Sequence, residues 1–338
     1  MIDTVKPDSV QVFGLCNVYY DSYYIKGLQD YFGIKNIKFN TADFPNFNQG
    51  TFAAIIKRNG ETVKMIIDSR DSNQIWPAEL EWCDVYGKVN YNAETTPQIG
   101  NEKIFPIGPS FGIKIWNLPQ ALAKAFRNSV RFKKSIADQR EFLANYWRQY
   151  TRFPLATYFK KETGRGFYVF FMGTIWQKEA QTNLFRSNFI YACKNNKEIE
   201  FEGGFAPRKD GNNFGFDNIV TKKRYPLAQY MSKIKQSVIV FNTPAVLSCH
   251  GWKLGEFLAM GKAMVSTAHL NVLPAPLEDG MHLMYVDGND IADYDQKIAI
   301  LLESEAQRKL IQTNAKAYFE RYLSPEKVIE ILYNIASK

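Results

Sequence analysis

The stretch PAVLSCHGWKLGEFLAMGKAMVST, residues 244–267, constrains the fold more than any other part of this chain. A β-branched run, Ser237–Thr243, precedes it and is typical of a buried parallel strand. Inside the stretch, apolar residues recur at helical spacing, and Gly261 follows them where a glycine commonly ends a helix. A second apolar run, Ala263–Thr267, predicts the next strand. The sequence therefore predicts a strand–loop–helix–strand unit of an α/β domain.

The predicted helix begins beside a glycine and has a carboxylate in its first turns. Gly251 lies just before the helix, and Glu256 lies about one turn into it. A helix start presents unpaired backbone N–H groups and the positive end of the helix dipole, which suits a phosphate. We therefore predict a phosphate site here, with Glu256 accepting hydrogen bonds from sugar hydroxyls. The alternative is a glutamate that only favours the helix dipole.

This stretch resembles the donor-binding motif of GT-B glycosyltransferases of the group 1, family 4-like kind. Seven positions fall in register with the family pattern: Pro244, Gly251, Glu256, Ala259, Gly261, Lys262 and Val265. Ser248 stands where the family has its first motif glutamate, which approaches the donor sugar, whereas the second holds the nucleotide ribose. The resemblance implies two Rossmann-like domains facing a cleft, a C-terminal helix that crosses back to the first domain, and no required metal.

Length and hydropathy patterning agree with two domains. The chain has 338 residues, of which 46% are hydrophobic and 22% are charged, so a globular protein with a large core is expected. Together with the resemblance, the patterning predicts an N-terminal domain over 1–117, a helical inter-domain segment over 118–165, a second domain over 166–317, and a C-terminal helix over 318–338. The resemblance implies that the first domain binds the acceptor, that the second binds the nucleotide sugar, and that the last helix returns to the first domain.

Alternating strand and helix patterns support the α/β class. In the first half, Asn59-Gly60 between two β-prone runs predicts a hairpin. A helix is expected to end at Gly33, and Glu198–Glu202 is expected to form a strand that stops before Gly203-Gly204. The remaining strands are predicted at Val10–Leu15, Lys35–Asn40, Phe52–Lys57, Val63–Asp68, Asp84–Tyr91, Lys103–Ile107, Phe167–Ile175 and His282–Val286.

Several features bear on location and partners. No apolar run is long enough to span a membrane, no signal peptide is expected, and the four cysteines are scattered, so a reducing cytoplasm is expected. The formal charge of +8 favours an anionic partner, although it also serves solubility. The segment Leu118–Tyr158 is basic and amphipathic. It could rest on an anionic membrane at the inner face, or grip an anionic acceptor, or simply carry a solvated basic face, and the last is favoured.

Positive charge near the predicted phosphate sites would stabilise a departing nucleoside diphosphate. In the second domain, Gly173 at a strand end and the following helix form one candidate site, and the resemblance implies that Lys178 and Arg186 approach the diphosphate. The other candidate contacts lie at the start of the motif helix: His250, Gly251, Trp252 and Lys253.

An acceptor hydroxyl must lose its proton, and the first domain has no histidine to serve as base. Asp71, in the loop after a predicted strand, is therefore the preferred base, and Asp21 and Asp68 are alternatives. A helix cap or turn is the competing role for each. Asp293-Tyr294-Asp295 has the spacing of a metal-binding DxD motif, but its place at a helix start favours capping, and no metal site is predicted.

The resemblance therefore implies a glycosyltransferase that uses a UDP- or GDP-linked sugar. The expected acceptor is a carbohydrate or glycolipid hydroxyl in cell-surface polysaccharide synthesis. Three alternatives stay open: an epimerase or hydrolase of the same fold, a sugar- or nucleotide-binding protein without catalysis, and a nucleic-acid binder, which is the least favoured.

Overall fold

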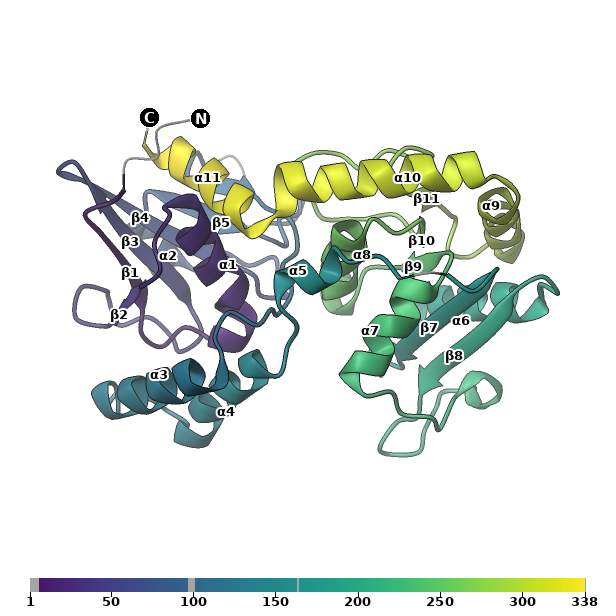
Figure 1. The fold of residues 1–338 in the computed structure, drawn as a ribbon, viewed down its shortest axis with the longest axis horizontal. Coiled ribbons are helices and arrows are strands. Elements are labelled where there is room, and N and C mark those ends of the chain that lie inside the picture. The colour runs from purple at the N-terminus through teal and green to yellow at the C-terminus, as the bar shows by residue number, and fades with distance from the viewer. Residues whose placement is uncertain (1–5, 97–100, 163, 338) are drawn as a thin grey trace. The chain divides into compact units, whose positions relative to one another are not determined.

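The computed structural model describes residues 6–96, 101–162 and 164–337. The chain divides into two compact units. Unit 1 comprises Met1–Tyr158, Asn271–Ala275 and Glu320–Lys338, and unit 2 comprises Phe159–Leu270 and Pro276–Phe319. Each unit contains a sheet with parallel strands and several helices, so the predicted α/β class is confirmed (Figure 1).

Unit 1 is built on a six-stranded sheet in the order β2-β1-β3-β4-β5-β6. Its strands are β1 (Ser9–Phe13), β2 (Lys38–Asn40), β3 (Phe52–Arg58), β4 (Glu61–Asp68), β5 (Val85–Lys88) and β6 (Ile104–Pro106). Strand β3 pairs antiparallel with β1 and β4, and the other pairings are parallel. The predicted hairpin joins β3 to β4, and Asn59 and Gly60 turn it with φ of 53° and 84°. Both values lie in the left-handed region that Asn-Gly favours.

The helices of unit 1 include the C-terminal one. They are α1 (Val18–Tyr31), α2 (Pro77–Trp82), α3 (Leu118–Arg131), α4 (Gln139–Tyr150), α5 (Leu155–Tyr158) and α11 (Pro325–Ala336). Helix α11 packs on α1, β4 and β5, which confirms that the C-terminal helix returns to the first unit (Figure 1). The approach is close, because a Cβ on Gly27 would lie 2.2 Å from the Pro325 carbonyl oxygen.

Unit 2 has two sets of parallel strands. Strands β7 (Tyr168–Thr174) and β8 (Glu200–Ala206) form one pair, and β9 (Val240–Asn242), β10 (Met264–Ser266) and β11 (Met284–Tyr285) form a second sheet. The Val238 N–H donates to the Tyr168 carbonyl over 2.8 Å and joins the two sets beside β9. The strands therefore lie in the order β8-β7-β9-β10-β11, with parallel pairing inside each set, which agrees with the Rossmann-like pattern expected for this half.

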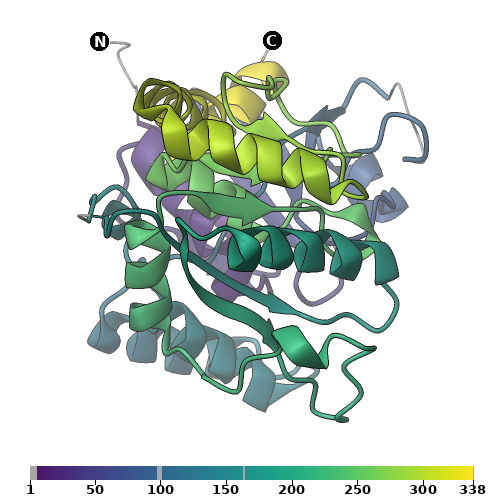
Figure 2. The ribbon, with the colours of Figure 1, turned by 90° about the vertical axis from the view of Figure 1, so that its right-hand side faces the viewer.

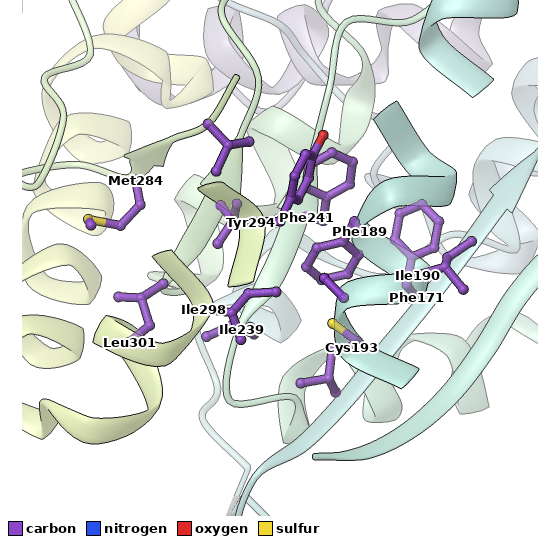
Figure 3. Close-up of a cluster of buried hydrophobic side chains, with 14 of the residues drawn as sticks. Phe171, Phe189, Ile190, Cys193, Ile239, Phe241, Met284, Tyr294, Ile298 and Leu301 are labelled. Atoms are coloured by element: carbon purple, nitrogen blue, oxygen red, sulfur yellow. The ribbon is translucent and has the colours of Figure 1, made fainter. Parts of the chain in front are cut away.

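Helices cover the strands of unit 2 and share a core with them. The helices are α6 (Ala180–Asn195), α7 (Leu227–Gln236), α8 (Trp252–Met260), α9 (Ile291–Glu303) and α10 (Glu305–Tyr318), with α6 along the β7–β8 pair in Figure 2. Three phenylalanines lie at the centre of the core (Figure 3). The rings of Phe189 and Phe241 stack with centroids 4.6 Å apart, and Phe171 meets Phe241 at 5.9 Å.

Strand β8 corrects the expectation that a strand stops before Gly203-Gly204. The strand continues through both glycines, at φ of 116° and 136°. A Cβ would lie 1.9 Å from the Phe171 carbonyl oxygen at Gly203 and 2.3 Å from the Ile219 carbonyl oxygen at Gly204. These two glycines therefore do not end the strand. They lie inside it and allow neighbouring backbone to approach closely, as glycine in a strand often does. Helix α2, which begins at Pro77, was not predicted.

Candidate functional site

The motif helix α8 begins at the carboxyl edge of the unit 2 sheet. Gly251 takes the N-cap position, and no side-chain hydrogen bond caps the helix in the described structure. Gly261, with φ of 60°, ends it as predicted. The first-turn N–H groups of α8 are therefore oriented as an anion site requires.

The loop between β9 and α8 holds a strained backbone. Leu247 and Ser248 both have left-handed φ, at 54° and 58°, although neither is a glycine. The Leu247 N–H donates to Glu179 Oε1 over 3.0 Å, and the Ala245 N–H donates to the Cys249 carbonyl over 3.0 Å. Strain of this kind persists where surrounding contacts hold it and is common at ligand sites. Ser248 thus lies in a turn whose shape the fold enforces.

Glu256 is a buried carboxylate in α8. Its side chain is only 6% exposed, in a helix whose other residues from Leu254 to Met260 are also buried. Its negative charge raises the pKa of Lys253 against the larger effect of burial, so the two side chains are near neighbours. Buried carboxylates are usually retained with a partner or a function.

Lys253 and Arg186 place two cations at the carboxyl end of β7. The Lys253 ammonium donates to the Met172 carbonyl over 2.5 Å and lies 4.6 Å from the Phe171 ring centroid. Arg186 Nη1 donates to the Thr174 carbonyl over 2.8 Å. Burial lowers the pKa of Lys253 to about 7, helped by the charge of Arg186, and burial lowers the pKa of Arg186 to about 10. The fold thus brings these two predicted residues together from α8 and α6.

Gly173 and Lys178 are placed differently. A Cβ on Gly173 would lie 3.0 Å from the Phe171 ring, so this glycine makes room for a core side chain. Lys178 is exposed in the turn before α6. Trp252, the first residue of α8, is half-buried. Among the described residues, no hydrogen bond joins Lys178 to Lys253 or Arg186.

A polar cluster at the ends of β9, β10 and β11 was not predicted. Asn242 Nδ2 lies 3.1 Å from Ser266 Oγ and 3.0 Å from His269 Nε2, and His269 Nδ1 lies 3.0 Å from the Tyr285 hydroxyl. Burial lowers the pKa of His269 to about 4, so its ring is neutral at physiological pH. The ring of His250, a predicted donor contact, lies 5.5 Å from that of His269. The available sequence signal was that these polar residues follow buried strands.

Arg208, which follows β8, was also missed. Its Nη1 donates to the Ile175 carbonyl, which follows β7, over 3.2 Å, and its Nη2 pairs with Asp210 Oδ2 at 2.5 Å. Arg208 therefore adds a third cation to this edge of the sheet.

In unit 1, Asp68 lies at the carboxyl end of β4 within a buried ionic network. Its Oδ2 accepts hydrogen bonds from Lys88 Nζ at 2.9 Å and from the Tyr86 hydroxyl at 2.7 Å, and its Oδ1 accepts from Arg70 Nε at 2.9 Å. Burial alone would raise the pKa of Asp68, but Arg70 and Lys88 outweigh it and hold the pKa below its usual range. Both oxygens are engaged, which suits a residue that positions its neighbours.

The other two aspartates have contrasting environments. Asp21 is buried in the first turns of α1, and its Oδ2 has no hydrogen-bond partner among the described residues. Burial raises the pKa of Asp21 well above its usual range, against the opposing effect of an Asn17 backbone hydrogen bond. Asp71 is exposed in the loop after β4.

The aspartates of the late DxD sequence lie in the first turns of α9, but the helix is capped by Asp290 and not by either of them. Asp290 caps α9 by accepting from the Ala292 N–H at 2.9 Å, and Asp293 Oδ2 accepts from the Asp287 N–H at 2.8 Å. Across the described residues, no three His, Cys, Asp or Glu side chains are grouped as a metal ion would need.

The helices of the described residues are each too short or too polar to cross a membrane.

No protein-family model matches the chain, and neither does any curated protein. Among solved structures, the chain is similar to TarM of S. aureus in complex with fondaparinux, α-GlcNAc-glycerol and UDP, with 14% identity, a TM-score of 0.46, and coverage of 77% of this chain and 45% of TarM. It is similar to Anabaena HepE in complex with UDP and glucose, with 14% identity, a TM-score of 0.45, and coverage of 77% of this chain and 64% of HepE.

A third similar structure is the C-terminal domain of LpcC from Francisella tularensis, a glycosyl transferase group 1 family protein, with 14% identity and a TM-score of 0.32 over 47% of this chain and 86% of that domain. The chain thus spans less than two thirds of the TarM and HepE structures. At these scores the similarities do not assign a function to this chain.

Proposed function

We propose that this protein is a glycosyltransferase that takes its sugar from a nucleoside-diphosphate sugar held by unit 2. One arrangement carries the proposal. The uncapped start of α8, the buried Glu256 within that helix, and the cations Lys253 and Arg186 lie at the carboxyl edge of one parallel sheet. Ligands of open α/β sheets bind at this edge.

Each part of the arrangement has a chemical role. The first-turn N–H groups of α8, with Gly251, bind phosphate oxygens, and His250 and Trp252 flank them. Glu256 accepts hydrogen bonds from the ribose hydroxyls. Lys253 and Arg186, with Lys178 from the turn before α6, stabilise the negative charge of the diphosphate as it leaves. Gly173 contributes by leaving room for the Phe171 ring, beside which the Lys253 ammonium lies.

The acceptor side belongs to the first domain, which we take as residues 1–117, with 166–317 as the donor domain. Asp71 is the proposed base, because it is exposed and follows the carboxyl end of β4. Asp68 binds Arg70 and Lys88 and so positions them. Asp21, buried in the first turns of α1, is the other candidate acid. A UDP- or GDP-linked sugar is the proposed donor, and a cell-surface carbohydrate or glycolipid, met at the inner face of a membrane, is the proposed acceptor.

Binding of nucleotides by the whole protein tests the donor site. Calorimetry with UDP, GDP, ADP and CMP should find one nucleotide that binds, and Glu256→Gln should weaken it about tenfold to a hundredfold, since hydrogen bonds to a charged group contribute roughly 1.5–3 kcal/mol. Glu303→Gln, at an exposed glutamate that ends α9, is the matched control and should bind like the wild type.

Transfer then separates the catalytic proposal from simple binding. With the corresponding nucleotide sugar and a hydroxyl acceptor, the wild type should release the nucleoside diphosphate, and Asp71→Asn should slow release without weakening binding. Absence of binding by all four nucleotides at millimolar concentration would sink the donor site, whereas binding without turnover would favour a non-catalytic sugar- or nucleotide-binding protein.

A further inference from the structure

Helix α3 presents its large apolar side chains to solvent. Leu122, Phe126 and Val130 are 56%, 73% and 61% exposed, and their four-residue spacing places them along one face of the helix. We call these three side chains the apolar stripe. The residues of α3 that are buried are small or polar: Ala121, Ala125 and Asn128.

This orientation is the reverse of an ordinary surface helix, which turns its apolar stripe toward the core. Scattered single apolar residues on a surface need no explanation, but a continuous stripe marks an interaction site. The stripe is extended at the helix start by Leu118, which is 37% exposed.

The helix is held firmly in this orientation. Asn117 and Gln120 form a reciprocal capping box at its start. On its buried side, Asn128 Nδ2 donates to the Tyr146 hydroxyl of α4 over 2.8 Å. Phe132, just after the helix, is buried so tightly that a Cβ on Gly14 would lie 2.4 Å from its ring. The stripe is therefore exposed by the packing of α3 and needs no rearrangement to meet a partner.

The charges around the stripe are positive. Residues 118–152 contain two acidic side chains, Asp138 and Glu141, against eight basic ones: Lys124, Arg127, Arg131, Lys133, Lys134, Arg140, Arg148 and Arg152. Glu141 is already paired with Arg148. Arg127, Lys133, Lys134 and Arg140 are exposed, and none forms an ion pair with another described residue.

Two of the basic side chains are instead held by the body of unit 1. Arg131 Nη1 donates to the Phe39 carbonyl over 2.9 Å, and Lys124 Nζ lies 5.2 Å from the Trp116 ring centroid. Of the free cations, Arg127 therefore lies on α3 within the span of the stripe, and Lys133, Lys134 and Arg140 follow the helix.

The geometry points to α3 as a docking helix that lies in the surface of an anionic lipid bilayer, with the apolar stripe inserted between headgroups and the free cations on the phosphates. The apolar stripe is complementary to the acyl chains just below the headgroups, and the unpaired cations are complementary to the anionic headgroups. The inference depends only on unit 1 and holds whether or not the donor site of unit 2 transfers a sugar.

Co-sedimentation with vesicles tests it on the whole protein. Wild type should bind vesicles that contain phosphatidylglycerol and phosphatidylcholine, bind those of phosphatidylcholine alone far more weakly, and lose affinity as salt rises. The triple variant Leu122→Ser, Phe126→Ser, Val130→Ser should lower binding to the anionic vesicles at least tenfold. Lys133→Gln with Lys134→Gln should lower it by about fivefold for each cation removed.

Two leucines elsewhere provide the control. Leu184 on α6 and Leu310 on α10 are 41% exposed, so Leu184→Ser with Leu310→Ser removes exposed apolar surface from unit 2 and should bind vesicles as the wild type does. Circular dichroism and melting temperature check that each variant is folded. Equal binding by wild type and the stripe variant overturns the inference, as does failure of wild type to bind anionic vesicles. A wild-type dimer that the stripe variant converts to a monomer also overturns it, because the stripe would then be covered by a second copy of the chain.

Discussion

Lys253 is a cation that the fold holds near its titration point. Burial lowers its pKa to about 7, with a further contribution from Arg186 and an opposing one from Glu256. An unperturbed lysine is fully charged at neutral pH. At neutral pH the Lys253 side chain is therefore a mixture of charged ammonium and neutral amine in the unliganded protein. Binding of a diphosphate would favour the charged form.

We predict that nucleoside-diphosphate affinity falls as the pH rises above 7. Above that pH the protein must take up a proton on Lys253 to bind the anion, which weakens binding by about tenfold for each pH unit. Calorimetry from pH 6 to pH 9 measures the slope. Lys253→Arg keeps the charge throughout this range and should flatten the profile; equal slopes for the two proteins would contradict a role for Lys253.

At the scale of elements, β8 shows what a pair of glycines inside a strand does. Gly203 lies against the backbone of β7, whereas Gly60 in the β3–β4 hairpin has open space around it, although both have left-handed φ. The two positions separate backbone strain, which they share, from steric overlap, which only Gly203 has.

Gly203→Ala should therefore destabilise the protein more than Gly60→Ala. Strain costs each variant about 1–2 kcal/mol, and overlap with the Phe171 carbonyl adds about 1–3 kcal/mol for Gly203→Ala. Urea denaturation midpoints followed by circular dichroism compare the two. Similar midpoints would show that the β7–β8 pair relaxes to admit the methyl group.

At the scale of the whole molecule, unit 1 is assembled from three separate parts of the chain. Asn271–Ala275 and Glu320–Lys338 belong to it although the intervening residues form unit 2. Val272 N–H donates to the Tyr91 carbonyl over 2.7 Å, and α11 covers α1, β4 and β5. The stability of unit 1 therefore depends on residues far apart in the sequence.

Leu332→Ala tests this dependence. Leu332 is fully buried in α11, and a Cβ on Gly87 of β5 would lie 2.8 Å from its Cδ1. Truncating it should cost about 2–5 kcal/mol and raise hydrogen exchange in α1, β4 and β5. Leu310→Ala, at an exposed position on α10, should leave exchange there unchanged. Unaltered exchange in Leu332→Ala would show that α11 is dispensable to the sheet.

The sequence predicted the turns and helix ends well, because the backbone preferences of a few neighbouring residues set them. Asn59-Gly60 has backbone preferences that match its turn, and Gly261 ends α8 in the left-handed conformation that glycine favours. Helix α8, from Trp252 to Met260, lies where the spacing of apolar residues predicted a helix. The predicted donor motif could be read from sequence because its residues lie on one continuous strand–loop–helix segment.

Only the tertiary structure decided which side chains meet at the candidate site, because those contacts join segments that are far apart in the sequence. Sequence spacing could not show that Arg186 from α6 and Lys253 from α8 converge on the carbonyls that end β7, or that His269 joins Asn242 and Tyr285 across three strands. The periodicity of α3 showed an amphipathic helix, but only its packing through alanines and Asn128 shows that the apolar stripe faces outward. Periodicity determines which residues share a face, and only the folded chain determines what that face meets.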